Sequence, residues 1–140
     1  MKYFEVRRRI NAPADRIWAI LTDKAALLAG DFAILKIEGD ISAGGKVKLW
    51  SKADPKRAFA LKVAVFEAPR EMLWRGGMPF GLFKGQRRFT LTPNQSGTDF
   101  HMREEFTGPM AGLITKSMPD LQPLFDRFGD ALKTKAEEQE

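Results

Sequence analysis

The sequence predicts an α+β fold in which a curved antiparallel sheet of about six or seven strands grips a long C-terminal helix. Two observations indicate this fold. The middle of the chain is a run of strand-like segments separated by turn residues, and the last third carries one apolar stripe at helical spacing. Such a helix must bury its stripe, and the chain offers one sheet as the partner. We therefore expect the helix to lie in the hollow of a bent sheet, as a single domain over residues 1–140.

Composition restricts the chemistry. The chain has 140 residues, of which 44% are hydrophobic and 29% charged, which indicates a folded domain with its own core. The absence of cysteine excludes disulfides and thiolate chemistry, and the single histidine, His101, cannot build a multi-histidine metal site. We expect no metal and no cofactor. Because no apolar run is long enough for a secretory signal or a membrane span, we expect a cytoplasmic protein without integral membrane association.

The N-terminal segment predicts one strand followed by two short helices. Residues 3–10 alternate between apolar and polar, with Arg8 as an exception on the apolar face. Residues 11–15 form a turn into a helix whose apolar residues recur at helical spacing. Residues 24–30 predict a second short helix, closed by Gly30.

The next segments alternate or are rich in β-formers and are separated by turn residues. They predict strands at residues 32–38, 46–51, 59–67, 71–75, 86–92 and 98–106.

The last third predicts helix. Pro119 should separate a short helical piece at residues 109–117 from a long helix that begins near Asp120. Pro123 fits the first turn of that helix, where a missing N–H has no partner to lose. The apolar stripe of the long helix contains Leu121, Leu124, Phe125, Phe128, Ala131 and Leu132.

Four stretches of the chain carry a family resemblance. They are residues 11–18 (NAPADRIW), 66–74 (FEAPREMLW), 85–93 (GQRRFTLTP), and 97–98 with 104–108 (GT and EEFTG). In this order they resemble the SRPBCC group, the START-like helix-grip domains that include polyketide cyclases, lipid-transfer domains and heat-shock ATPase activator homologues. The resemblance implies a deep hydrophobic pocket between sheet and long helix, used for lipids, polyketides, hormones or aromatic compounds. The prolines at 119 and 123 depart from the smoother last helix of the family and bear on the volume of that pocket.

The C-terminal hairpin places two opposite charges face to face. A loop at residues 94–97 pairs Pro93 with Thr98, and counting back along the strands pairs Arg87 with Glu104. Strict alternation puts both on the apolar face of the hairpin. Two interpretations remain open. The pair is a structural ion pair, or it is a ligand anchor in which Arg87 holds a carboxylate or enolate and Glu104 orients it or acts as a base.

Three other features are candidates for function. The apolar loop at residues 78–85 is a lid over an apolar opening, a partner surface, or a loop packed on the core. Trp74 is a core aromatic or a pocket wall. His101 has outward parity and is expected to be a surface histidine. The expected ligand-binding residues are Trp74, Phe80, Phe83, Arg87, Phe89, Phe100, Met102, Glu104, Leu121, Phe125 and Phe128.

Together these features favour the binding of a small hydrophobic molecule, with Arg87 and Glu104 giving the pocket its polarity. The alternatives are a polyketide cyclase or dehydratase that uses the same pocket, and a protein-partner module like the chaperone activators. Nucleic acid is not expected as a partner, because the 23 cations are spread along the chain among 18 anions. The ligand's identity and the choice between monomer and homodimer stay open.

Overall fold

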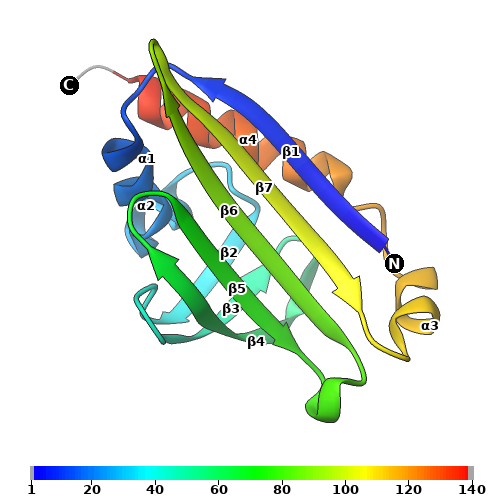
Figure 1. The fold of residues 1–140 in the computed structure, drawn as a ribbon. Helices are drawn as coiled ribbons and strands as arrows, with labels where there is room; N and C mark the ends of the chain where they lie inside the picture. Colours follow the sequence, from blue (N-terminus) through cyan, green and yellow to red (C-terminus); the bar gives the residue numbers. More distant parts are fainter. Residues whose placement is uncertain (1, 139–140) are drawn as a thin grey trace.

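The computed structural model describes residues 2–138, and its strands form one curved antiparallel sheet with a long helix against the concave face (Figure 1). The strands lie in the order β1-β7-β6-β5-β4-β3-β2. The elements follow the chain as β1 (Lys2–Ile10), α1 (Ala14–Leu21), α2 (Lys24–Ala29), β2 (Ile34–Gly39), β3 (Lys46–Ser51), β4 (Asp54–Glu67), β5 (Glu71–Gly77), η1 (Pro79–Gly81), β6 (Lys84–Asn94), β7 (Gly97–Thr107), α3 (Ala111–Lys116) and α4 (Gln122–Glu137).

The predicted fold class is confirmed: seven strands and a long C-terminal helix are present in this part of the chain. Helix α4 begins at Gln122, close to the expected start, with Pro123 in its first turn. The side chain of Asp120 accepts a hydrogen bond of 3.0 Å from the backbone N–H of Gln122, which satisfies one of the free donors at the start of the helix. The short helix α3 lies inside the predicted range 109–117.

Strand β4 differs from the prediction in its start and in its regularity. It begins at Asp54 rather than at residue 59, because Asp54 already pairs with Ser51 of β3, although the register shifts before Phe59 pairs with Leu49. The register with β5 shifts between Val63 and Val65. This bulge exchanges the two faces within one strand, so the almost continuous apolar run could not reveal which side chains point inward.

The core fills the space between the concave face of the sheet and α4. Phe128 of α4 packs against the sheet side chains Phe89 and Phe100, with ring centroids 6.1 and 6.4 Å apart, and against Phe32 at 4.9 Å. All four rings are at most 2% exposed. Within the predicted stripe of α4, Phe125, Phe128 and Leu132 are therefore buried, and the rest of the stripe is half-buried.

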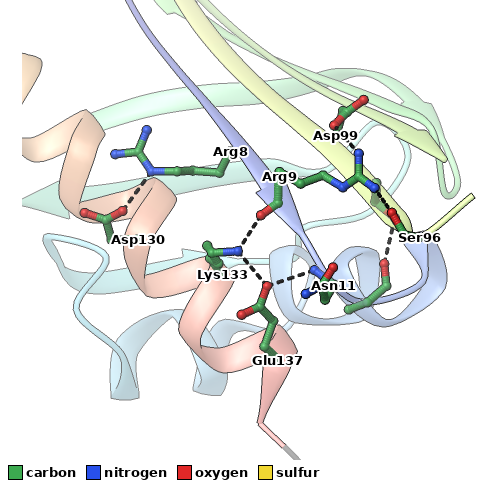
Figure 2. A network of polar contacts seen from close by, with 10 residues as sticks. Arg8, Arg9, Asn11, Ser96, Asp99, Asp130, Lys133 and Glu137 are labelled. Carbon is green, nitrogen blue, oxygen red and sulfur yellow. Dashed lines mark hydrogen bonds and ion pairs between the residues drawn. The ribbon is translucent and has the colours of Figure 1, made fainter. Parts of the chain in front are cut away.

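Arg8 lies on the apolar face of β1, as its parity predicts, and α4 accommodates it with a glycine. A Cβ atom added at Gly129 would lie 2.8 Å from Cγ2 of Val6 and 3.1 Å from Cγ of Arg8. The missing side chain lets α4 approach β1 closely and gives room to the aliphatic stem of Arg8. The Arg8 Nε then donates to Asp130 at 2.8 Å, on the next residue of the helix (Figure 2).

Candidate functional site

Arg87 and Glu104 form an ion pair on the concave face, and the pairing predicted from the hairpin loop is confirmed by the β6–β7 register. The Nε and Nη2 atoms of Arg87 both lie 2.8 Å from Oε1 of Glu104. The two side chains are 22% and 18% exposed, so the pair sits at the margin of the core. Because both contacts go to Oε1, Oε2 of Glu104 has no donor within residues 2–138.

Helix α4 holds the guanidinium from the other side. The Arg87 Cζ atom lies 4.8 Å from the ring centroid of Phe125, within the range of a cation–π interaction. Arg87 is therefore placed between the Glu104 carboxylate and an aromatic ring. This arrangement links the sheet to the first turns of α4 at one polar point.

Trp74 lies beside Arg87 in the β5–β6 register and is 4% exposed. Its ring packs edge-on against Phe89, with centroids 4.7 Å apart. The indole Nε1 is buried and has no hydrogen-bond acceptor among the described residues. An unsatisfied buried donor costs about 1–3 kcal/mol. An oxygen atom from a bound molecule would remove that cost.

A pair of glycines adjoins this row of side chains. Gly76 and Gly85 lie opposite each other on β5 and β6, one alternation away from Trp74 and Arg87. A Cβ at Gly85 would lie 3.4 Å from Oε2 of Glu104, so a side chain at residue 85 would contact that oxygen and the glycine leaves this space free. Sequence reasoning missed this feature, although glycines that recur near the ends of two adjacent strands are its signal.

Half-buried apolar side chains surround the same end of the concave face. Phe83 stacks on Phe106, with centroids 5.8 Å apart and planes at 10°. Leu61 lies opposite Gly76, and Leu121 precedes the first turn of α4. These side chains are only partly covered by the core, so this end of the concave face is partly accessible.

The remaining expected ligand-binding residues are packed in the core. The two best-defined pockets of the described residues lie elsewhere. A cavity of about 90 Å³ opens on the outer face of the sheet, and one of about 520 Å³ lies at residues 11–14 and 93–98. Neither of them lies between the sheet and α4, so the expected pocket there stays a prediction. The side chains packed there, each at most 2% exposed, are Phe89, Phe100, Met102, Phe125 and Phe128.

The apolar loop between β5 and β6 corrects one expectation. Phe80 was expected to line the ligand site, but its side chain is 98% exposed. The reason is local: Phe80 has a left-handed backbone, with φ of 60°, inside the short turn η1. Of the two phenylalanines in this loop, Phe83 alone turns back onto the sheet.

His101 lies on the outer face, as its parity predicts, but it is half-buried among charged side chains. Its Nε2 is buried without a hydrogen-bond partner in residues 2–138 and lies 3.8 Å from Oε1 of Glu5. Burial, together with the nearby Arg7 guanidinium, lowers the pKa of His101. The Arg103 guanidinium bridges Glu5 and Glu105 beside it and holds the pKa of Glu5 below its usual value.

A long C-terminal helix held in the concave face of a seven-stranded antiparallel sheet defines the helix-grip class of proteins. The chain belongs to the family described as polyketide cyclase / dehydrase and lipid transport, which matches residues 1–137 and is part of the SRPBCC superfamily. The family expected from the sequence is therefore confirmed. None of the helices within residues 2–138 has the length and hydrophobicity needed to cross a membrane.

Solved structures share the fold at low sequence identity. Protein MLL2253 from Mesorhizobium loti is 16% identical with a TM-score of 0.74, and the match covers 99% of this chain and 100% of that one. The hypothetical protein jhp0584 from Helicobacter pylori is 12% identical with a TM-score of 0.79, over 97% and 88%. The di-domain ARO/CYC StfQ from the steffimycin biosynthetic pathway is 10% identical with a TM-score of 0.73, over 96% of this chain and 50% of StfQ. No curated protein matches the sequence significantly.

Proposed function

We propose that the protein binds a small, mostly apolar molecule that carries a hydrogen-bond acceptor, on the concave face where Trp74, Arg87 and Glu104 lie. The observation that carries this proposal is the buried indole N–H of Trp74, which has no acceptor among the described residues. A donor in this position is costly in the free protein and favourable once an oxygen of a ligand reaches it. The lipid transport named in the family description supports an apolar ligand class.

The side chains around Trp74 would contact different parts of the ligand. Leu61, Phe83 and Leu121 offer apolar surface, and its burial by a ligand contributes about 25 cal/mol per Å². Oε2 of Glu104 accepts a hydrogen bond from a hydroxyl of the ligand, and the free donors of Arg87 serve a carbonyl or carboxylate. Because the concave face is packed in the free protein, binding requires the half-buried side chains at this end to move aside.

A cyclase or dehydratase activity at the same site is the second candidate. It is supported by the family description and by Oε2 of Glu104, which has free space beside it at Gly85 and can accept a proton from a carbon acid held beside Arg87. Replacing Glu104→Gln separates the two functions. An enzyme loses turnover in this variant while ligand binding falls only modestly, whereas a binding protein has no turnover to lose.

Native mass spectrometry of the purified protein and thermal shifts with fatty acids, sterols and aromatic acids test the binding proposal. We expect a bound small molecule or a stabilising ligand. In the Trp74→Phe variant a smaller aromatic ring replaces the indole and the N–H is lost, so the affinity for that ligand should fall about tenfold, the effect of one hydrogen bond. Trp50→Phe is the matched control, because Trp50 lies over the cation of Lys36 and away from the site.

Two results would contradict the proposal. One is a mass equal to the bare chain together with no thermal shift for any ligand class. The other is a ligand whose affinity is the same in the wild type, in Trp74→Phe and in Trp50→Phe, because such a ligand would bind elsewhere.

A further inference from the structure

One end of the molecule exposes apolar side chains in a way that the ligand site does not explain. Turn η1 and helix α3 lie at the same end of the sheet, beyond the ends of β5 and β7 (Figure 1). Phe80 is 98% exposed and Leu113 of α3 is 69% exposed, with Met78 and Leu82 beside them at about 40%. We call the surface formed by residues 78–84 and 108–116 the apolar tip.

The two segments of the apolar tip form one fixed surface. The backbone N–H of Met110 donates to the carbonyl of Leu82 at 2.9 Å, and that of Met78 donates to Phe83 at 2.8 Å. Gly108 has a φ of 106°, and a Cβ there would lie 2.7 Å from the carbonyl oxygens of Gly81 and Leu82. Because these backbone contacts fix the two segments relative to each other, their apolar side chains are exposed on an ordered backbone.

The charged side chains within the apolar tip itself are both positive. Residues 78–84 and 108–116 contain Lys84 and Lys116 and no aspartate or glutamate. Neither Lys84 nor Lys116 makes an ion pair within the part of the chain that the structure describes.

The opposite end of the molecule is built differently. There Arg8 pairs with Asp130, Arg9 with Asp99, and Lys133 with Glu137 (Figure 2). The charges at that end are therefore largely neutralised by one another. The apolar tip, by contrast, combines exposed apolar side chains with the two unpaired cations Lys84 and Lys116.

We propose that the apolar tip docks on the surface of an anionic lipid bilayer. Phe80 and Leu113 would insert at the boundary between headgroups and acyl chains, while Lys84 and Lys116 lie at the level of the phosphates. A single protruding aromatic side chain can insert into a lipid bilayer, which adapts to its shape. A stable protein–protein interface instead needs a complementary area of about 800 Å² on each partner. The inference goes beyond the proposed function, because docking requires no bound ligand.

Co-sedimentation with vesicles tests the proposal at low and at physiological salt. We expect the protein to bind vesicles of equal parts phosphatidylcholine and phosphatidylglycerol, more weakly at higher salt, and to bind phosphatidylcholine vesicles little. Phe80→Asn should weaken partitioning by at least about tenfold, because a phenylalanine ring is no longer buried in the bilayer. Asparagine tolerates the left-handed backbone, so the variant should stay folded. Lys84→Gln with Lys116→Gln should weaken binding to the anionic vesicles several-fold.

Leu28→Ser is the matched control, because Leu28 is an exposed apolar residue on α2, outside the apolar tip, and its loss should leave vesicle binding unchanged. Trp74→Phe should keep vesicle binding, and Phe80→Asn should keep the thermal shift with a soluble ligand. The two variants therefore test ligand binding and membrane docking independently of each other. Three results would overturn docking: no binding of the wild type to anionic vesicles, equal binding by Phe80→Asn, or a concentration-dependent dimer that Phe80→Asn abolishes while vesicle binding is absent.

Discussion

Two buried side-chain nitrogens on opposite faces of the same sheet have no hydrogen-bond partner among residues 2–138: Nε1 of Trp74 and Nε2 of His101. Their chemistry differs. The indole N–H is always a donor, so only an acceptor can satisfy it, and a ligand is the available source. The imidazole can instead change its protonation state, so its energy depends on pH. The first atom bears on ligand binding and the second on stability.

The stability of the protein should depend on His101 below pH 6.5. Burial and Arg7 lower the pKa of His101, so the folded state favours the neutral ring, although Glu5 opposes the shift. As the pH falls through 6.5 the unfolded state takes up a proton first, and the free energy of unfolding decreases until the folded pKa is reached. Arg103 and Thr90 are the other neighbours of the ring, from β7 and β6.

Denaturant unfolding of the wild type and of His101→Gln at a series of pH values measures this effect. The wild-type free energy of unfolding should fall relative to that of the variant as the pH is lowered through this window. A difference that stays constant with pH would mean that His101 is equally easy to protonate in both states.

At the scale of elements, the contact between α4 and β1 depends on the absence of a side chain at Gly129. In Gly129→Ala the new methyl would meet Val6, whose branched side chain has little freedom to move. The overpacking costs about 1–3 kcal/mol, and the better helix propensity of alanine returns about 1 kcal/mol. We expect a net loss of roughly 1 kcal/mol in the free energy of unfolding.

The same substitution at Gly112 is the control. Gly112 lies in α3, and a Cβ there has no atom within 4 Å. Gly112→Ala should therefore leave stability unchanged or raise it by up to about 1 kcal/mol. If both variants change stability by the same amount, the close approach of α4 to β1 does not limit residue 129.

The elements that the sequence predicted best are those with a short-range constraint. The Arg87–Glu104 pairing followed from a period of two and a short hairpin loop, because a slip of one residue would turn the apolar side chains of both strands outward. The face of β4 was not predictable, since a bulge next to Val63 leaves no mark in a run of apolar residues.

The candidate site was predictable only in part, because tertiary packing decides it. The outward direction of Phe80 depends on a left-handed backbone that apolar composition does not encode. The unsatisfied N–H of Trp74 and the open row at Gly76 and Gly85 depend on which strands become neighbours. Alternation assigns a side chain to a face, but it does not determine what fills the space in front of that face.

At the scale of the whole molecule, the last helix of the chain covers the free edge of the first strand. The Gln122 side chain donates to the carbonyl of Glu5 at 2.8 Å, and Lys133 donates to that of Arg9 at 2.6 Å (Figure 2). An uncovered edge strand presents unpaired backbone groups to another chain. Helix α4 therefore both fills the hollow of the sheet and blocks pairing at its β1 edge.

Removing this cover should promote association of the protein. The Glu137 carboxylate accepts the backbone N–H of Asn11 at 2.8 Å and pairs with Lys133 at 2.7 Å, and these contacts hold the pKa of Glu137 below its usual value. The stabilisation that Glu137 contributes is therefore present above pH 4.5 and is lost as the pH falls through the folded pKa.

At neutral pH, Lys133→Ala with Glu137→Ala should lower stability modestly and increase aggregation, because carbonyl and N–H groups at the end of β1 become free to pair. Static light scattering over hours at moderate concentration measures the difference. Lys135→Ala with Glu138→Ala is the control, since it removes an exposed pair of the same type from the same end of the helix and touches no strand. Equal aggregation of the two double variants would show that the loss of charge, rather than the opening of the β1 edge, drives association.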